Sequence, residues 1–389
     1  MSEAILAVNV GSSSIKFAIY DAADLAPRLR GQIESIGTHA HFGARGALAD
    51  TVAGAEPPAA GGHAEAITWL IDLLGDRLAD VALRAVGHRI VHGGAEHVAP
   101  ERIDEATIAS LERLIPLAPD HQPRGLAAVR AVTARWPSLP QVACFDTAFH
   151  AKQPRLARLF ALPRALTDEG IVRYGFHGLS YEYIADVLPG IAGARADGRV
   201  IVAHLGQGAS LCAMRERRSV ATSMGFSVID GLVMGKRSGR IDPGVLLYLQ
   251  QHKGMSVSEV GELLNHRSGL LGVSGISDDM RVLEVSDDPH AAEALDLFAY
   301  RAAAEIAGMA AAIEGLDVLV FTGGIGEHSV SMRTRIAARC RWLGVDIDPD
   351  ANATNATRVG TAASNVDVLV IPTDEELVLA RATRALLAK

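Results

Sequence analysis

The sequence predicts an α/β protein built from two domains. Its 389 residues exceed the roughly 250–300 that one hydrophobic core usually supports, so we expect domains at residues 1–148 and 149–389. Short β-branched runs alternate with Ala-rich stretches of helical period, which is typical of α/β architecture. In addition, a short glycine-containing turn directly follows a strand-like run at three places in the chain.

The predicted strands are short apolar runs rich in valine and isoleucine. They are expected at residues 4–8, 85–91, 142–145, 200–203, 318–321 and 366–371. Between the first two, Thr38 to Ala64 has no sustained period, so we expect a loop-rich excursion of the first domain with solvated histidines at positions 39, 41 and 63. The pattern breaks again at Lys152, just after the strand that ends near Asp146.

The clearest predicted helix runs from Ala291 to Glu314, with Gly315 as its C′ residue. Apolar residues at i+3 and i+4 spacing define one face, which we expect to pack into the core. They are Leu295, Phe298, Ala302, Ile306, Met309 and Ile313. The chain's last helix could return to pack on the first domain.

The three glycine turns span Asn9 to Lys16, His204 to Ser210 and Thr322 to Ser329. Glycine allows positive φ and a close approach of the backbone, so exposed N–H groups can donate to phosphate oxygens. One such turn is weak evidence of a phosphate site. Three of them, each after a strand, indicate a nucleotide held in a cleft between two related halves.

Composition excludes several classes of function. The net charge of −8 comes without a basic block, which argues against nucleic acid as the main partner. Cys144, Cys212 and Cys340 are far apart with no CxxC spacing, so we expect neither disulfides nor a zinc site. Neither a basic, apolar leader nor a membrane-length apolar run is visible. We therefore expect a cytoplasmic protein.

Two glycine-flanked arginines are candidates for anion binding. Arg89 lies in Gly87–Gly94 and Arg237 in Gly235–Gly239, where a planar guanidinium could reach a bound anion with two hydrogen bonds. The alternative is an ordinary ion pair with a surface carboxylate. Asp146 ends a buried strand, a common place for ligand-contacting carboxylates in α/β enzymes, although it could also cap the next helix.

Two histidines could donate to a phosphoryl oxygen. His177 lies in Arg173–Gly178 and His121 lies in Leu117–Pro123. Each could equally be a structural histidine with satisfied hydrogen bonds.

The order of these motifs resembles the acetate kinase family, which includes propionate kinases and belongs to the actin/Hsp70/sugar-kinase superfamily of duplicated α/β domains. The matching segments run almost from end to end: residues 9–16, 89–94, 145–150, 173–178, 204–208, 222–226, 237–239, 277–281, 321–329 and 371–377. The resemblance implies reversible, ATP- and Mg²⁺-dependent phosphorylation of acetate to acetyl phosphate by direct in-line transfer. It also implies a homodimer formed through the second domain.

The resemblance further implies roles for individual residues. Arg89 binds the carboxylate, His177 and Arg237 stabilise the transition state, and Asp146 acts as catalytic acid/base or positioning carboxylate. Asn9 and Glu375 hold Mg²⁺ or Mn²⁺, while Glu376 could be an ordinary first-turn residue. The acyl pocket comprises Val91, His121, Phe176 and Val228. The ATP or ADP site comprises Lys16, His204, Leu205, Gly206, Gln207, Gly208, Asp279, Met280, Arg281, Gly324, Ile325, Gly326, Glu327 and His328.

Several positions depart from the family pattern. Gln207 and His328 replace asparagines in the nucleotide loops, and Val228 replaces a pocket proline. Lys236 and Arg240, where Thr and Asp are usual, make the loop around Arg237 more basic. Asp120 replaces a leucine before His121, and a buried, unpaired carboxylate there would be costly. Either Asp120 points to solvent, or the acceptor is not plain acetate.

The sequence leaves three functions open. The first is a carboxylate kinase acting on acetate, or alternatively on propionate or another short-chain acid. The second is a kinase of the same superfamily that acts on a hydroxyl, against which the two glycine-flanked arginines argue. The third is a nucleotide-binding regulator without turnover.

Overall fold

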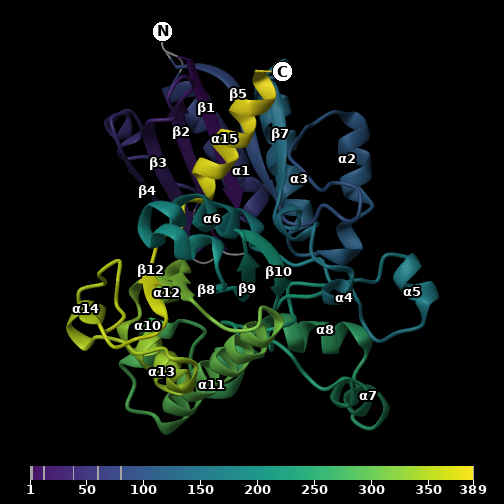
Figure 1. Ribbon diagram of the computed structural model, residues 1–389. Coiled ribbons are helices and arrows are strands. Elements are labelled where there is room, and N and C mark those ends of the chain that lie inside the picture. The colour runs from purple at the N-terminus through teal and green to yellow at the C-terminus, as the bar shows by residue number, and fades with distance from the viewer. Residues whose placement is uncertain (1–2, 12–13, 38, 59–60, 79–80, 389) are drawn as a thin grey trace. The chain divides into compact units, whose positions relative to one another are not determined.

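The computed structural model describes residues 3–11, 14–37, 39–58, 61–78 and 81–388. Ser12 and Ser13 of the first glycine turn, and Thr38, Ala59 and Ala60 of the predicted excursion, lie outside the described residues. The chain forms two compact units, one of Met1–Ala151 with Asp374–Lys389 and one of Lys152–Thr373 (Figure 1). The division thus falls after Ala151 rather than after residue 148, and the last helix belongs to the first unit.

The first unit contains a mixed sheet of seven strands within its described residues, in the order β4-β3-β2-β1-β5-β7-β6. The strands are β1 Glu3–Val10, β2 Ile15–Asp21, β3 Pro27–Glu34, β4 His41–Arg45, β5 Ala82–Ile90, β6 Glu101–Arg102 and β7 Gln141–Phe145. β1, β5 and β7 are parallel neighbours. Their carboxyl ends therefore meet at one edge of the sheet, where parallel α/β sheets commonly bind ligands.

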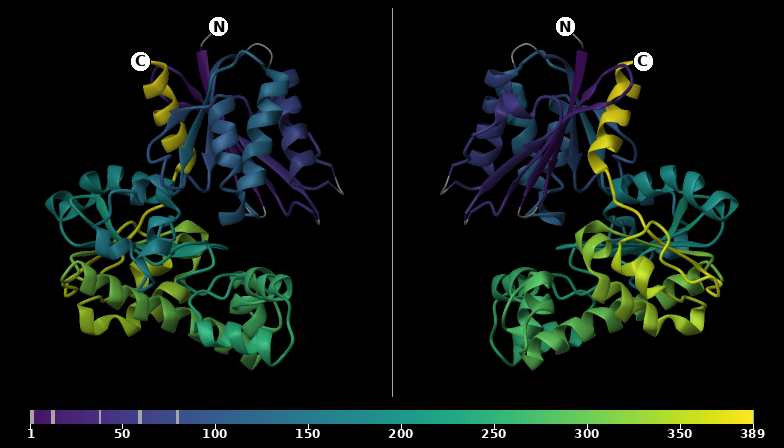
Figure 2. Two further views of the ribbon diagram at one scale, coloured as in Figure 1. Left: turned by 90° about the vertical axis from the view of Figure 1, so that its right-hand side faces the viewer. Right: turned by 90° about the vertical axis from the view of Figure 1, so that its left-hand side faces the viewer.

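Helices cover both faces of this sheet. They are η1 Ala49–Val52, α1 His63–Arg77, α2 Glu105–Glu112, η2 Ile115–Leu117, α3 Gln122–Arg135, η3 Ala148–His150 and α15 Glu375–Leu387. Figure 2 shows α15 on one face, where it contacts β1 and β5, and α1 with α3 on the other. Gly87 of β5 allows the close approach of α15, because a Cβ there would lie 2.4 Å from the Thr383 hydroxyl. This double cover explains why seven of the eight β1 residues are buried.

The excursion from Thr38 to Ala64 is more structured than the sequence indicates. It contains β4 and η1 and the first residues of α1. His39 and His41 are exposed as expected, whereas His63 is half-buried. β4 pairs only with β3 at the end of the sheet, so its alternating burial is that of an edge strand.

The second unit contains a five-stranded sheet within its described residues, in the order β10-β9-β8-β11-β12. The strands are β8 Val200–Leu205, β9 Ala209–Arg215, β10 Arg218–Thr222, β11 Val318–Thr322 and β12 Asp367–Val370. β8, β11 and β12 are parallel neighbours. Because His204 of β8 pairs with Thr322 of β11, the second and third glycine turns leave the sheet side by side.

The helices of the second unit are mostly short. They are α4 Arg155–Arg158, α5 Arg164–Asp168, α6 Gly178–Ala192, η4 Gly193–Asp197, α7 Pro243–Gln251, α8 Val257–His266, α9 Gly269–Ser274, α10 Met280–Glu284, α11 Pro289–Ala312, α12 Gly323–His328, α13 Val330–Arg339, η5 Arg341–Leu343 and α14 Pro349–Ala353. Within the described ranges, no helix has the length and apolar character needed to cross a membrane.

The predicted long helix corresponds to α11, and all six residues of its predicted apolar face are buried. The helix begins and ends two residues earlier than predicted, and its C′ residue differs from the predicted one by one position. Glu314, with φ of 60°, occupies C′, and Gly315 follows it. Gly315 N donates to Ala310 O and Glu314 N donates to Ala311 O, which is the Schellman pattern.

Candidate active site

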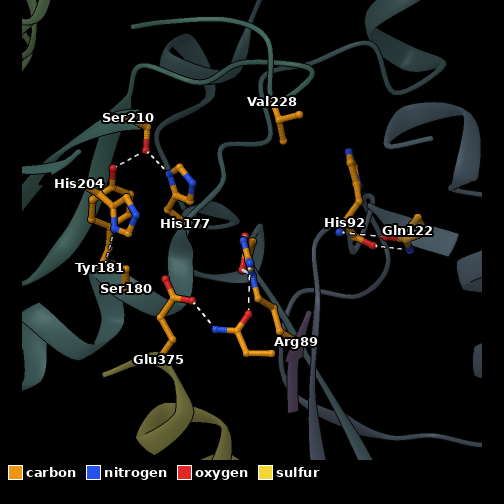
Figure 3. Close-up of polar contacts among 12 residues, drawn as sticks. Arg89, His92, Gln122, His177, Ser180, Tyr181, His204, Ser210, Val228 and Glu375 are labelled. Atoms are coloured by element: carbon orange, nitrogen blue, oxygen red, sulfur yellow. Dashed lines mark hydrogen bonds and ion pairs between the residues drawn. The ribbon is translucent and has the colours of Figure 1, made fainter. Parts of the chain in front are cut away.

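In the first unit, Arg89 is the centre of a buried polar network (Figure 3). Its Nε and Nη2 donate to the two carboxylate oxygens of Asp146 at 2.9 and 2.6 Å. Its Nη1 donates to Asn9 Oδ1 at 3.2 Å. Asn9, Arg89 and Asp146 lie at the adjacent ends of β1, β5 and β7. The surface ion pair considered for Arg89 is therefore wrong, because the Asp146 side chain is only 1% exposed.

Charge compensation keeps the Arg89 guanidinium cationic. Burial by itself would lower the pKa of Arg89, but the Asp146 carboxylate, followed by Glu375 and Glu376, more than offsets it and raises the pKa. Arg89 therefore remains charged although it is buried. A small anion that binds to it would lie close to the carboxylates of Asp146, Glu375 and Glu376.

Glu375 and Glu376 open helix α15 and face Asn9. The Asn9 amide nitrogen donates to Glu375 Oε2 and to Glu376 Oε1, each at 2.9 Å. Burial, and next the neighbouring Glu375 charge, raise the pKa of Glu376. Lys16, which pairs with Asn9 across β1 and β2, opposes that shift. Glu376 is thus part of the network rather than an ordinary first-turn residue.

Asp374 fixes the start of α15 in the first unit. Its carboxylate accepts from Arg30 Nη1 at 3.0 Å and from Tyr20 Oη at 3.2 Å, and it caps the helix by accepting from Leu377 N. The adjacent Glu375 and Glu376 are thereby held at the edge where β1 and β5 end.

The donor set at this edge fits a hard divalent cation. Mg²⁺ prefers carboxylate and amide oxygens and usually uses only one or two protein carboxylates. Burial and the neighbouring Glu375 charge make the ionised form of Glu376 costly, and a bound cation would offset that cost. Groups of three or more His, Cys, Asp or Glu suited to a metal are absent from the described residues, so a complete protein cage is not offered there.

The acyl-pocket residues of the first unit lie beside β5. Val91 is 4% exposed. The next residue, His92, is tied to α3, because Gln122 accepts from its N–H and donates to its carbonyl. His121 is the N-cap residue of α3. Asp120 is half-buried. Burial lowers the pKa of Arg124, and the Asp120 carboxylate partly opposes that shift, so Asp120 is not an uncompensated charge.

In the second unit, His177 and Arg237 converge on Gly208. A Cβ at Gly208 would lie 3.2 Å from His177 Nε2 and 3.5 Å from Arg237 Nη2. The missing side chain therefore leaves a space that two nitrogen donors line. Arg237 Nη1 is held at 2.8 Å by the carbonyl of Val228, which links a predicted pocket residue to a predicted catalytic one.

Hydrogen bonds to buried hydroxyls orient the two histidines of this site (Figure 3). His177 Nδ1 lies 2.8 Å from Ser210 Oγ, and Ser210 Oγ also contacts Tyr181 Oη at 2.5 Å. His204 Nδ1 lies 2.8 Å from Ser180 Oγ. The two imidazole rings stack with centroids 4.3 Å apart.

The loop from Gly206 to Gly208 is joined to two other loops. Gly235 N donates to Gln207 O at 3.2 Å, and Gln207 Nε2 donates to Asp278 O at 3.4 Å. Lys236 lies 3.5 Å from the Asp278 carboxylate. Thus the predicted nucleotide residues Gly206, Gln207 and Gly208 lie beside the loops that carry Arg237 and Asp279.

The third glycine turn forms the short helix α12. Gly323, at φ of 77°, begins it, and the Glu327 carboxylate accepts from Gly323 N and Thr373 N at 2.9 and 3.1 Å. Gly324 and His328 are exposed. Glu327 therefore stabilises the turn through backbone hydrogen bonds. The family resemblance implied only a role in nucleotide binding for this residue.

A fully buried arginine supports α12 from below. Arg333 donates to the carbonyls of Gly326 and Glu327 at 3.0 and 2.9 Å. It also donates to Asn352 Oδ1, Asn352 O and Asn355 Oδ1 at 2.7, 3.0 and 2.6 Å. All five guanidinium N–H groups thus have neutral acceptors, and burial lowers the pKa of Arg333.

Asp279, the N-cap residue of α10, and Arg281, in the first turn of that helix, form a local pair. Arg281 Nη2 donates to Asp279 Oδ2 at 2.6 Å, and this bond lowers the pKa of Asp279. The Arg281 side chain is 89% exposed, whereas Met280 between them is buried.

The sequence model of the Acetokinase family matches residues 4–381. The chain belongs to the acetokinase family. The resemblance inferred from the order of the motifs is therefore confirmed.

Curated members of the acetokinase family are similar over nearly the whole chain. An acetate kinase of Rhodopseudomonas palustris (strain ATCC BAA-98 / CGA009) is 52% identical over 388 residues, which cover 98% of each chain. An acetate kinase of Nitrobacter hamburgensis is 48% identical and covers 99% of this chain and 96% of its own.

Solved structures of acetate and propionate kinases are similar to this chain over nearly its whole length. A propionate kinase from Francisella tularensis has a TM-score of 0.87 at 35% identity, covering 98% of this chain and 99% of its own. The acetate kinase of Porphyromonas gingivalis has a TM-score of 0.83 at 33% identity, covering 99% and 100%. The predicted fold class of this acetokinase-family chain is thereby confirmed.

Within each unit, the structure brings the predicted acetokinase residues together. Asn9, Arg89, Asp146 and Glu375 form one network, and His177, Gly208 and Arg237 form another. No sequence pattern indicated Tyr181, Ser180 or Arg333. Ser210 could have been found, because it ends the second glycine turn and its side chain faces His177.

Proposed function

We propose that the protein is an acetate kinase, which transfers the γ-phosphoryl group of ATP to acetate and catalyses the reverse reaction. The convergence of His177 Nε2 and Arg237 Nη2 on the space above Gly208 carries this proposal. Catalysis of phosphoryl transfer is mostly positioning and neutralisation of charge on the transferred group. Two nitrogen donors over a side-chain-free loop suit that task.

Acetate needs no general base. A carboxylic acid with a reference pKa near 4 is already ionised at neutral pH. An acetate oxygen forms the new bond to the γ-phosphorus, the bond to the β,γ-bridging oxygen breaks, and ADP leaves with that electron pair. Asp146 then serves as a positioning carboxylate, since both of its oxygens accept from Arg89. A kinase acting on a hydroxyl would need a base instead.

Arg89 binds the acetate carboxylate through the part of its guanidinium that Asp146 does not use. Asp146 takes Nε and one hydrogen of Nη2, and Asn9 takes Nη1 at 3.2 Å. The remaining hydrogens of Nη1 and Nη2 are the ones available to acetate. The residues proposed to contact the methyl group are Val91 and His121 of the first unit and Phe176 and Val228 of the second; Val91 and Phe176 are 4% and 1% exposed.

The nucleotide is bound as its Mg²⁺ complex. Asn9 and Glu375, which are joined by a hydrogen bond of 2.9 Å, would hold the ion. Bound Mg²⁺ supplies neutralisation of the phosphate charge. The chain's own contributions are Lys16 for the phosphates and the turns at residues 204–208, 279–281 and 324–328 for the nucleotide.

Propionate is the second candidate acceptor. The propionate kinase of Francisella tularensis is 35% identical over nearly the whole chain. Val228 also stands where the family usually has proline. One methylene changes selectivity by only about 1–3 kcal/mol, so both acids are expected to react at different kcat/KM.

The active form is a homodimer that uses helix α7. This helix, Pro243–Gln251, buries none of its residues in the single chain, although it is rich in leucine. Val245, Leu247 and Tyr248 are 40, 54 and 51% exposed. A second copy of the chain would cover this apolar helix.

The buried free thiols of all three cysteines fit a reducing, cytoplasmic location.

The test is a hydroxamate-trapping assay of the purified protein with MgATP and acetate, propionate, butyrate or dicarboxylates. We expect acyl phosphate from acetate, less from longer acids, and none from dicarboxylates. Confirmed ATP binding without acyl phosphate from any acid would refute the proposal and favour a hydroxyl-directed or non-catalytic role.

A further inference from the structure

Two buried hydroxyls behind His177 form a chain of hydrogen bonds that ends on its imidazole. Tyr181 Oη contacts Ser210 Oγ at 2.5 Å, and Ser210 Oγ contacts His177 Nδ1 at 2.8 Å. Tyr181 and Ser210 have no exposed surface. We propose that Tyr181 and Ser210 are positioning residues that hold His177 as the neutral tautomer with its proton on Nε2.

The direction of the chain follows from its proton count. Ser210 has one hydroxyl hydrogen and Tyr181 has one phenolic hydrogen. A phenol is the more acidic of the two groups and is the better donor, so Tyr181 donates to Ser210. The Ser210 hydrogen is then left to donate to His177 Nδ1. Because a neutral imidazole carries one N–H, the proton of His177 lies on Nε2.

That tautomer directs a donor at the correct place. Nε2 lies 3.2 Å from the position that a Cβ of Gly208 would occupy, beside Arg237 Nη2. Phosphoryl oxygens accept hydrogen bonds only, so a lone pair on Nε2 would repel them. With Nδ1 accepting from Ser210, His177 can donate to the phosphoryl group without first becoming an imidazolium. This step rests on the proposed kinase activity.

The backbone and a second histidine keep the ring in this orientation. His177 is at φ of 58°, a left-handed conformation that is uncommon outside glycine, and Tyr181 N donates to its carbonyl at 3.1 Å. His204 stacks on the ring with an interplanar angle of 21°. Strain of this kind is stored at functional sites where surrounding contacts hold it.

The test is a ¹H–¹⁵N multiple-bond NMR correlation of the histidine rings in the full-length protein without substrates. His177→Asn, which lacks the ring, assigns the resonances. We expect an unprotonated Nδ1 and a protonated Nε2 for His177. In Ser210→Ala we expect both tautomers, and in Tyr181→Phe a weaker preference for the Nε2–H form. In Ser180→Ala, the matched control beside His204, the His177 tautomer is expected to stay unchanged.

Steady-state kinetics give the second reading. Ser210→Ala is expected to lower kcat roughly tenfold or more with a smaller change in KM for ATP, whereas Ser210→Thr, which keeps the hydroxyl, restores most of it. An Nδ1–H tautomer or an imidazolium at neutral pH in the wild type would overturn the proposal. So would an unchanged tautomer in both Ser210→Ala and Tyr181→Phe.

The NMR result does not depend on turnover. If no acid is phosphorylated but His177 shows the Nε2–H form, the proposed function fails and the hydrogen-bond chain stands. If acetate is phosphorylated but the tautomer is reversed, only the hydrogen-bond chain fails. If Ser210→Ala does not fold, the wild-type and Tyr181→Phe spectra still decide.

Discussion

Replacing the buried Arg333 by methionine is expected to destabilise the second unit by about 3–5 kcal/mol. The arginine is fully buried and makes five hydrogen bonds, three of them to backbone carbonyls of Gly326, Glu327 and Asn352. Removing a donor from each buried carbonyl costs about 1 kcal/mol or more. Methionine carries no charge that must be desolvated on folding. This gain offsets part of the free energy lost with the other hydrogen bonds, which leaves a net loss in the stated range.

The assay is urea unfolding of Arg333→Met, followed by KM measurements for ATP and acetate. The matched control is Arg335→Met on the same helix, because Arg335 pairs with Asp296 at the surface, where their side chains are 36 and 56% exposed. That pair is worth less than about 1 kcal/mol. We also expect a higher KM for ATP but not for acetate in Arg333→Met, since Arg333 supports α12. Equal unfolding midpoints and equal KM values for ATP in both variants would refute this reasoning.

Four further outcomes are expected. Arg237→Leu should lower kcat by orders of magnitude with unchanged circular dichroism, and near-normal turnover would remove Arg237 from the mechanism. Glu375→Gln should raise the Mg²⁺ concentration needed for half-maximal activity, and an unchanged titration would contradict its role. Leu247→Glu should yield monomers in light scattering, whereas Leu156→Glu, on a side chain that is 86% exposed, should not; a dimer in both would place the interface elsewhere. Burial lowers the pKa of His88 to about 4. Its contribution to stability is therefore complete above about pH 6.5 and is lost as the pH falls toward 4. His88→Gln should flatten that decline in thermal unfolding, and an unaltered pH slope would show that His88 does not cause it.

Local patterns predicted much of the fold. The runs at residues 200–203 and 318–321 are strands β8 and β11, because apolar β-branched residues buried on both faces leave few other conformations. The apolar face of α11 was also predicted, since its period is set by the helix itself. Features that depend on residues close together in the sequence could therefore be predicted from it.

Features that depend on residues far apart in the sequence could not be predicted from it. Ser210 and His177 are 33 positions apart, and Asn9 and Glu375 are 366 apart, so no local spacing links them. The family resemblance named Arg89 and Asp146, but not that they bind each other with two hydrogen bonds. Glu327 illustrates the same limit, because its bond to Thr373 N exists only once β11 and β12 have paired.

The discontinuous first unit has a consequence for how the protein is made. Residues 3–151 leave the ribosome long before Asp374 and α15, which complete that unit. Until then Gly87 lacks the helix that packs on it, and Asn9 and Arg30 lack Glu375 and Asp374. Since domains fold as units, usually in order of synthesis, a nascent chain without α15 lacks both a finished hydrophobic face and the carboxylates of Glu375 and Glu376. Completion of the first unit thus waits until α15 has been synthesised.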